Sequence, residues 1–174
     1  MKKSNDIDFL LGVIGYPIEH SLSPIIHEYW MNKNNIKGNY KAFNIKPENI
    51  KATLEGMRAF NIKGLNVTVP HKRVVIKYLD TIDKDAEELG AVNTIVNKNG
   101  ILKGYNTDGV GFMYGLDKFK NWNKNDPILI IGSGGAASSV LYYLIRNDVK
   151  NIRIMNRTKA HIKKLKNLYV NIIE

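Results

Sequence analysis

The chain has 174 residues, of which 44% are hydrophobic and 24% are charged, with a formal net charge of +10 and no cysteine. These proportions are typical of a globular protein, while the missing cysteines exclude disulfides, thiolate catalysis and cysteine metal sites. No apolar run approaches the roughly 18 residues that cross a bilayer, and the polar residues 1–8 lack the apolar core of a signal peptide, so the sequence predicts a cytoplasmic protein.

Strand-like and helix-like patterns alternate through the first part of the chain. Strands are predicted at 10–14, 40–45 and 65–69, and helices at 23–34, from 47 to Gly64, at 72–79 and at 84–89. Ser23-Pro24 is typical of a helix start with serine as the N-cap. Residues 93–96 and 101–105 alternate around Asn99-Gly100, and this predicts a hairpin because the pair accepts the positive φ angles of a tight turn.

The second part of the chain continues the alternation. Asp108 is predicted to cap a helix that runs to Phe119, and the polar segment 120–127 suits a connection between domains. The later predicted elements are a strand at 128–131, a helix at 136–146, a strand at 151–155, a helix at 158–168 and a strand at 170–173. The whole pattern predicts an α/β protein with mainly parallel sheets.

The last predicted domain is short. The 48 residues from Pro127 onward provide about two strand–helix units, which leave part of a parallel sheet uncovered. The sequence therefore predicts an incomplete domain that is either cut short or paired with a partner.

A glycine-rich turn directly follows the strand at 128–131 and opens a helix. Gly132, Gly134 and Ala137 stand at the G-x-G-x-x-A spacing, and this context makes the pattern indicative of dinucleotide binding. Gly132 permits the tight turn, Gly134 lets a pyrophosphate approach the backbone, and the N–H groups at the helix start bind phosphates. A plain strand–turn–helix junction is the alternative.

The next strand ends in Asn156-Arg157-Thr158, where NAD-binding proteins carry an acidic residue for the ribose hydroxyl. Arg157 can instead bind a 2′-phosphate with its planar guanidinium group, so the sequence favours NADP. The alternative is a solvated arginine at a helix start, a position that the helix dipole slightly disfavours.

Polar side chains stand at the predicted strand ends and helix starts of the first part. They are Ser21, Ser23, Asn66, Thr68, Lys72, Asn93, Asn106, Thr107 and Asp108. Ligands of open α/β sheets bind beyond the carboxyl ends of the strands, so these residues can converge on one crevice that takes a carboxylate and ring hydroxyls. The sequence leaves plainer interpretations open: Ser23 and Asp108 as helix caps, Asn66 and Asn93 as partners of loop backbone, and Lys72 as a surface lysine.

Six motifs occur in order along the chain: Gly15-Tyr-Pro-Ile-Glu-His-Ser-Leu-Ser-Pro24, Asn66-Val-Thr-Val-Pro-His-Lys72, Gly90-Ala-Val-Asn-Thr94, Gly104-Tyr-Asn-Thr-Asp108, Gly132-Ser-Gly-Gly-Ala136 and Asn156-Arg-Thr158. Together they resemble the motifs of the shikimate dehydrogenase family, which includes quinate dehydrogenases. The resemblance covers residues 12–158. It implies a shikimate-binding catalytic domain over 1–107, followed over 108–174 by the start of an incomplete, Rossmann-type NADP-binding domain.

The resemblance also implies roles for single residues. Ser21, Ser23 and Thr68 would hold the substrate carboxylate, and the ring hydroxyls would be bound by Asn66, Lys72, Asn93 and Asp108. Lys72, paired with Asp108, would be the acid/base group in the NADPH-dependent reduction of 3-dehydroshikimate to shikimate, a step of chorismate and aromatic amino-acid biosynthesis. NADP would be bound by Gly132, Ser133, Gly134, Gly135, Ala136, Asn156, Arg157 and Thr158.

Two departures from the family pattern qualify this interpretation. His161 stands where the family usually has a second arginine, which predicts weaker 2′-phosphate binding unless Lys159 or Lys163 compensates. Family members also continue through the rest of the nucleotide sheet and return a substrate-contacting glutamine to the first domain. A catalytically silent remnant that binds shikimate-like ligands therefore stays open as an alternative, and the motifs do not rank shikimate against quinate.

Other functions find little support in the sequence. The charge of +10 attracts nucleic acid, but neither an aromatic-interleaved basic patch nor a helix-turn-helix pattern accompanies it. The four histidines do not cluster with carboxylates at metal-ligand spacing. The expected protein is a monomer or homodimer that binds no metal, nucleic acid or membrane.

Overall fold

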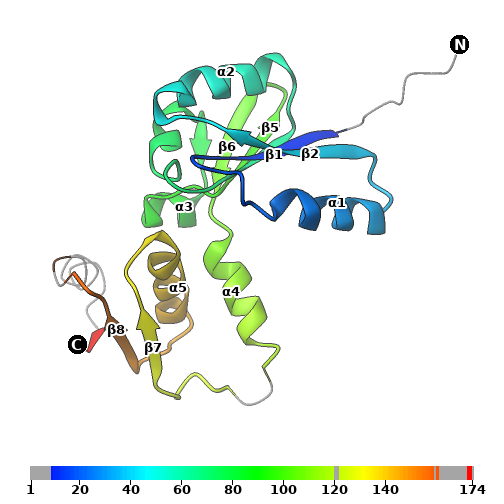
Figure 1. The fold of residues 1–174 in the computed structure, drawn as a ribbon. Coiled ribbons are helices and arrows are strands. Elements are labelled where there is room, and N and C mark those ends of the chain that lie inside the picture. The colour runs from blue at the N-terminus through cyan, green and yellow to red at the C-terminus, as the bar shows by residue number, and fades with distance from the viewer. Residues whose placement is uncertain (1–8, 120–121, 159, 161–171, 174) are drawn as a thin grey trace, which may run out of the picture. The chain divides into compact units, whose positions relative to one another are not determined.

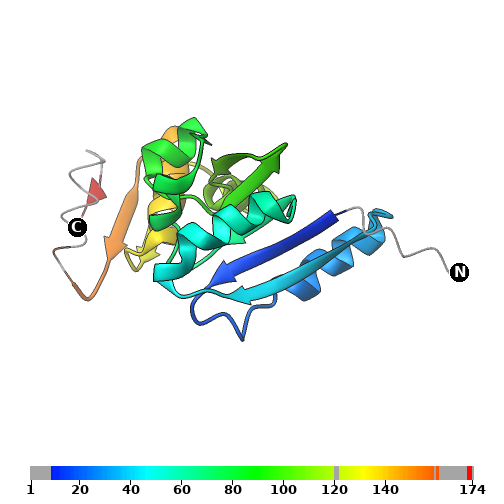
Figure 2. The same ribbon diagram turned by 90° about the horizontal axis from the view of Figure 1, so that it is seen from above.

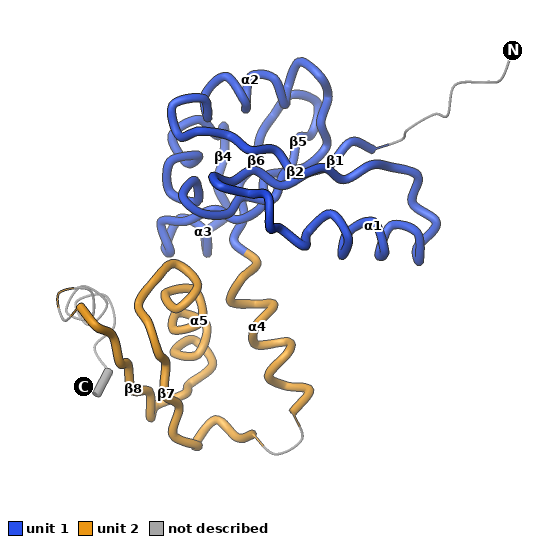
Figure 3. The backbone as a smooth tube through the Cα atoms, viewed as in Figure 1, with its two compact units in different colours: residues 1–106 blue, residues 107–174 orange. Residues whose placement is uncertain are grey.

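The computed structural model describes residues 9–119, 122–158, 160 and 172–173. The chain divides into two compact units, residues 1–106 and residues 107–174 (Figure 3). Within the described ranges, no helix is long and apolar enough to cross a membrane.

The first unit is built on a six-stranded mixed sheet in the order β2-β1-β3-β5-β6-β4 (Figure 1). The strands are β1 (Phe9–Gly15), β2 (Gly38–Asn44), β3 (Gly64–Val67), β4 (Thr81–Ile82), β5 (Thr94–Lys98) and β6 (Ile101–Tyr105). β1 runs parallel to β2 and β3, and β4 runs parallel to β6, whereas β5 is antiparallel to β3 and β6. The strands predicted for this unit are confirmed, and β4 is a short addition to them.

Two helices lie on opposite sides of β1 and β2 in this unit, α1 (Ser23–Lys33) and α2 (Ile50–Ala59) (Figure 1; Figure 2). The strand alternation of β1 explains this, because consecutive side chains point to opposite faces. Val13 packs in a cluster with residues that include Met31 of α1, and Ile14 packs in the main core with residues of α2.

A third helix and two 3₁₀ turns complete the first unit: α3 (Lys84–Leu89), η1 (Pro47–Asn49) and η2 (Val74–Tyr78). Asp83 caps α3 through a bond from the Asp85 N–H, and Gly90 ends this predicted helix with a left-handed φ of 60°. The α-helix predicted at 72–79 is wrong, since the segment forms the tighter η2 turn. Three consecutive β-branched residues, 74–76, disfavour an α-helix there.

The end of α2 also differs from the prediction. Gly64 was expected to end the helix, but α2 ends at Ala59 and Gly64 is the first residue of β3. Asn61, with φ of 52°, turns the chain instead, and the Ile62 N–H returns to the Met57 carbonyl at 3.0 Å. Asparagine tolerates this left-handed conformation better than most residues.

Two predicted helix caps are also wrong. The N-cap of α1 is Leu22, so Ser23 is already the first helical residue. The N-cap of α4 (Asp108–Leu116) is Thr107, so Asp108 likewise lies inside its helix, which ends at Leu116 rather than at Phe119.

The hairpin prediction is confirmed. The turn between β5 and β6 consists of Asn99 and Gly100, with φ angles of 55° and 86°. Two positive φ angles in a two-residue loop are the geometry that matches the twist of paired strands.

The second unit contains a parallel sheet in the order β7-β8-β9, made of β7 (Ile128–Ile131), β8 (Ile152–Met155) and β9 (Ile172–Ile173). The helix α5 (Gly135–Arg146) connects β7 to β8, and α4 packs against it. Because α4 belongs to this unit, the polar segment 120–127 does not separate the two units as predicted. The predicted helix at 158–168 lies almost wholly outside the described residues.

Candidate functional site

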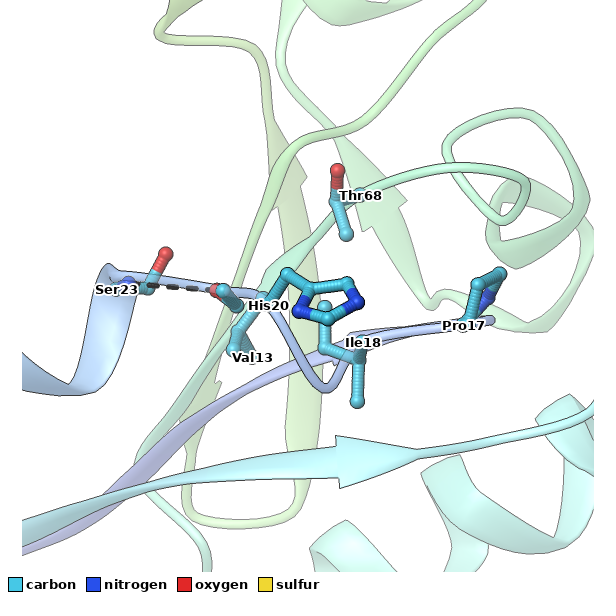
Figure 4. Close-up of a pocket in the computed structure, with 7 residues that line it drawn as sticks. Val13, Pro17, Ile18, His20, Ser23 and Thr68 are labelled. Atoms are coloured by element: carbon cyan, nitrogen blue, oxygen red, sulfur yellow. Dashed lines mark hydrogen bonds between the residues drawn. The ribbon is translucent and has the colours of Figure 1, made fainter.

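A pocket of about 260 Å³ opens in the first unit beyond β1 and β3 (Figure 4). It is lined by Val13, Pro17, Ile18, His20, Ser21, Ser23 and Thr68. Ser21, Ser23 and Thr68, the three residues predicted to hold a carboxylate, therefore lie around one cavity. In Figure 4 the hydroxyl oxygens of Ser23 and Thr68 point to the same side.

The loop after β1 brings these hydroxyls together. The Ser23 N–H donates to Ser21 Oγ at 3.3 Å, which turns the loop into α1. The Thr68 N–H donates to the Ile14 carbonyl at 3.0 Å, which continues the β1–β3 pairing to the edge of the pocket. A Cβ atom added to Gly15 would lie 2.6 Å from the Thr68 side chain, so only glycine allows this close approach.

Next to the pocket residues, a series of side-chain hydrogen bonds crosses the sheet. The Tyr40 hydroxyl donates to Asn66 Oδ1 at 2.7 Å, Asn66 Nδ2 donates to Thr94 Oγ1 at 3.3 Å, and Thr94 Oγ1 donates to Asn93 Oδ1 at 2.9 Å. Asn66 and Asn93, both predicted to bind ring hydroxyls, are thus joined through Thr94. The Asn66 side chain bonds to other side chains. The plainer interpretation of Asn66, as a partner of loop backbone, therefore does not hold.

Tyr40, which the sequence analysis did not single out, begins this series of hydrogen bonds. Its ring is only 2% exposed and stacks on His27 with ring centres 4.2 Å apart. Burial raises the pKa of the Tyr40 hydroxyl above its ordinary value, and a hydrogen bond with Ser23 opposes part of that rise. The phenol therefore stays protonated and able to donate at neutral pH. The one available signal was that a tyrosine buried on a strand usually needs a hydrogen-bond partner.

Lys72 lies in the turn that follows Thr68 and is half-buried. Its carbonyl accepts from the Val92 N–H at 2.8 Å, and the neighbouring His71, fully buried, places Nε2 2.7 Å from the Ile45 carbonyl. The backbone that carries Lys72 is therefore held from two sides.

The other residues of the predicted polar cluster are Asn106, Thr107 and Asp108. Asn106 is buried, and its Nδ2 donates to the Ala91 carbonyl at 2.9 Å. Thr107 is the exposed N-cap of α4, and Asp108 is half-buried at the first position of that helix. Lys72 belongs to the first unit and Asp108 to the second, so their pairing stays a prediction.

In the second unit, the glycine-rich turn has the geometry that its spacing indicates. Gly132 has a φ of 108°, which favours glycine, and its N–H donates to the Met155 carbonyl at 2.8 Å. Gly134 is the N-cap of α5 and makes no side-chain capping bond. Cβ atoms added at Gly134 or Gly135 would meet nothing within 4 Å, so packing within the described protein does not explain either glycine. The same open space leaves room for a ligand to approach the backbone.

The polar residues after β8 begin beside this turn. Ile131 pairs with Met155 in parallel register, so the chain leaves both strands at the same edge of the sheet. Asn156 Nδ2 donates to the Thr158 carbonyl at 3.0 Å, and Arg157 is exposed. Helix N–H groups and an adjacent exposed guanidinium fit a ligand with several phosphates.

Other predicted contributors lie outside the described residues, namely Lys159, His161 and Lys163. Within the part of the chain that the structure describes, no three His, Asp or Glu side chains are grouped so that they could hold a metal ion.

Comparisons with known proteins match both units. The family description "shikimate dehydrogenase substrate binding domain" matches residues 13–95, and "shikimate / quinate 5-dehydrogenase" matches residues 115–173. The NADP(+) shikimate dehydrogenase of Caldanaerobacter subterraneus subsp. tengcongensis is 46% identical over 156 residues, which are 90% of this chain and 56% of that protein. The chain thus spans little more than half the length of this curated relative.

Solved structures of shikimate dehydrogenases are also similar to this chain. The crystal structure of shikimate dehydrogenase from Aquifex aeolicus is 40% identical with a TM-score of 0.88, over 95% of this chain and 62% of that one. The shikimate 5-dehydrogenase of Thermus thermophilus in complex with NADP(H) and shikimate is 29% identical with a TM-score of 0.88, over 95% and 63% of the two chains.

Proposed function

The chain belongs to the shikimate dehydrogenase family, and from this premise we propose that it acts in the reversible, NADP-dependent reduction of 3-dehydroshikimate to shikimate. The observation that carries the proposal is the pocket that Ser21, Ser23 and Thr68 line together. The activity belongs to chorismate and aromatic amino-acid biosynthesis. A cytoplasmic location and a monomeric or homodimeric state stay predictions of the sequence.

The pocket binds the substrate carboxylate in this proposal. Hydroxyl groups donate readily to a carboxylate oxygen, and Ser23 stands at the first position of α1, where the N-terminal N–H groups and the helix dipole favour an anion. Asn66, next to the pocket, binds a ring hydroxyl and so fixes the orientation of the ring.

Lys72 acts as the acid/base group. NADPH, when bound, supplies the hydride that reduces the carbonyl carbon. Charge then develops on the carbonyl oxygen, where the ammonium of Lys72 stabilises it and donates a proton to that oxygen. In the reverse direction the amine of Lys72 removes the proton from the hydroxyl. Asp108 orients the Lys72 ammonium.

The second unit holds the cofactor. The backbone of Gly132, Ser133, Gly134, Gly135 and Ala136 binds the pyrophosphate at the start of α5, and the open space at Gly134 and Gly135 supports this role. Asn156, Arg157 and Thr158 hold the adenosine ribose and its 2′-phosphate. Arg157 supplies the positive charge that selects NADP over NAD.

Calorimetric titration and turnover of the same 174-residue chain test the proposal. We expect heat of binding with shikimate and with NADP, and NADP reduction when shikimate is added. Parallel titrations with quinate and with NAD rank the two substrates and the two cofactors. Shikimate binding without any turnover would support the ligand-binding alternative, and binding of neither shikimate nor quinate would overturn the proposal.

A further inference from the structure

We propose that Tyr40 is a positioning residue of the shikimate pocket, which fixes the side-chain amide of Asn66 so that Asn66 meets the ligand as a hydrogen-bond donor. The inference rests on the proposed function, because it assigns to Asn66 a contact with a ring oxygen of shikimate. It goes beyond that function by naming a residue that acts on the ligand through another side chain.

The first step is the count of protons at Tyr40. A phenol has one proton, and the Tyr40 hydroxyl directs it to Asn66 Oδ1 at 2.7 Å. The carbonyl oxygen of the Asn66 amide therefore points toward Tyr40. The NH₂ group of the same amide must point away from Tyr40.

The second step is the other end of the Asn66 amide. Thr94 also has one hydroxyl proton, and it directs this proton to Asn93 Oδ1 at 2.9 Å. Thr94 Oγ1 is consequently an acceptor for Asn66 Nδ2 at 3.3 Å. Donors and acceptors agree along the whole series. A flip of the Asn66 amide would require both hydroxyls to exchange their donor and acceptor roles, and the Thr94–Asn93 bond would be lost because Thr94 has only one proton. One N–H of the amide goes to Thr94, and the second remains for a ligand.

The third step is the rigidity of Tyr40. Tyr40 in β2 pairs with Leu11 of β1, and Asn66 in β3 pairs with Val13, so the tyrosine reaches across β1 to the asparagine. Its ring is 2% exposed, packs with Val13, Ile18 and Met31, and stacks in parallel on His27. A ring held in this way keeps its hydroxyl at one place, which suits a positioning role.

The consequence concerns the chemistry of the ligand. An Asn66 that offers an N–H needs an acceptor on the ligand, and the oxygen of a ring hydroxyl or carbonyl is one. The same orientation serves both the alcohol and the ketone of a dehydrogenase reaction. The plain alternative is that Tyr40 only fills the core between β1, β2 and α1.

The test is a double-mutant cycle on the full 174-residue chain. Tyr40→Phe keeps the ring and its stacking but removes the donor, and we expect the Kd for shikimate to rise about 3- to 10-fold, the loss typical of one hydrogen bond. In an Asn66→Ala background the same change should alter the Kd less than about 2-fold, because the two residues act as one unit. Tyr142→Phe is the matched control: Tyr142 is also buried, and its hydroxyl accepts from Arg146, yet it belongs to the second unit.

A second readout needs no ligand. Nitrogen-15 NMR of the Asn66 side-chain amide should show a clear shift of its NH₂ resonances in Tyr40→Phe and none in Tyr142→Phe. Unchanged Asn66 resonances, or a shikimate Kd that responds to Tyr40→Phe equally with and without Asn66, would overturn the inference. Failure of the wild-type chain to bind shikimate or quinate would instead refute the proposed function, whereas the NMR result would still report the Tyr40–Asn66 coupling.

Discussion

At the scale of single residues, two asparagines of the predicted polar cluster have different hydrogen-bond partners. Asn106 Nδ2 donates to the backbone carbonyl of Ala91, whereas Asn66 bonds to the side chains of Tyr40 and Thr94. Ser23 and Asp108 are not helix caps, so the structural explanation that the sequence left open for them does not apply.

Lys72→Ala tests the acid/base assignment. We expect kcat for NADP-linked shikimate oxidation to fall about 10²- to 10⁴-fold, the usual contribution of a positioned proton donor. The shikimate Kd from calorimetry should change only a few-fold, since the carboxylate contacts remain. Lys77→Ala, at an exposed lysine five positions along the same segment, is the control and should keep wild-type turnover. Equal turnover in the two variants would refute the role of Lys72.

Arg157→Ala tests the cofactor assignment. The guanidinium of Arg157 is exposed and is proposed to bind the 2′-phosphate of NADP, a group that NAD lacks. We expect the Kd for NADP to rise about 10- to 100-fold, as for loss of a charge-assisted contact, and the Kd for NAD to stay nearly constant. Calorimetric titration with both cofactors checks this, and an equal weakening of the two would contradict a 2′-phosphate contact.

At the scale of elements, a close helix contact in the second unit and a pair of hydrogen bonds in the first unit hold neighbouring elements together. In the second unit α4 meets α5 at a glycine: a Cβ added to Gly109 would lie 2.6 Å from the Ser139 carbonyl. In the first unit Arg58 of α2 donates to Asp80, and Asp80 also accepts from the Leu102 N–H of β6. These contacts join elements that are distant in sequence.

Gly109→Ala tests the helix contact. The added methyl group forces α4 and α5 apart, and we expect the free energy of unfolding of the second unit to fall by about 1–3 kcal/mol, the usual cost of overpacking. Gly111→Ala is the matched control in the same helix, since its Cβ would meet nothing within 4 Å. That change should stabilise by up to about 1 kcal/mol through helix propensity. Urea unfolding compares the two, and equal effects would count against a tight α4–α5 contact.

Asp80→Asn tests the hydrogen bonds through which Asp80 joins Arg58 of α2 to Leu102 of the β5–β6 hairpin. The Leu102 N–H and then Arg58 lower the pKa of Asp80 below its ordinary value of 3.8. A lowered folded-state pKa means that the charged carboxylate stabilises the fold above the unfolded-state pKa, and that this stability is lost as the pH falls through the folded-state pKa.

We therefore expect Asp80→Asn to lower the free energy of unfolding at pH 7 by less than about 1 kcal/mol, because the pair is partly exposed. The difference from wild type should shrink as the pH falls below 3.8. Urea unfolding over a pH series measures it, with the exposed Asp117→Asn as the control. A difference that is constant with pH would show that charge plays no part.

At the scale of the whole molecule, each unit has its own core. The first is centred on residues of β1, β3, β5, β6 and α2, and the second on residues of α4, α5 and β8. The candidate substrate pocket belongs to the first unit, and the glycine turn with Arg157 belongs to the second. Each proposed ligand thus has most of its contacts in one unit.

Hydrogen exchange of the whole chain tests this division. Shikimate should protect amides of β1, β3 and the loop that carries Ser21, whereas NADP should protect amides of β7, β8 and the start of α5. At roughly 100-fold excess over Kd, a ligand that binds only the folded unit adds about 2.7 kcal/mol to its stability. Mass spectrometry of peptides from each unit measures the protection. Protection by shikimate confined to the second unit would contradict the assignment of its pocket.

The sequence by itself determined the order and type of most elements and the place of the glycine turn. These depend on local signals: alternation along strands, helical spacing, and φ angles that only a few residues accept, as at Asn99-Gly100 and Gly132. Motif order also identified the family. Local signals failed where neighbours competed, as at η2, where a β-branched run gave a 3₁₀ turn, and at Asn61, which ended a helix in place of glycine.

Only the tertiary structure decided which polar residues share a site. Ser21 and Thr68 line one pocket, and Tyr40 bonds to Asn66 across 26 positions, because β1 lies between β2 and β3 in one register. Strand order and register depend on the packing of the whole sheet, and a local pattern does not contain them. For that reason the sequence presented Tyr40 as a buried strand residue, while the fold made it a partner of Asn66.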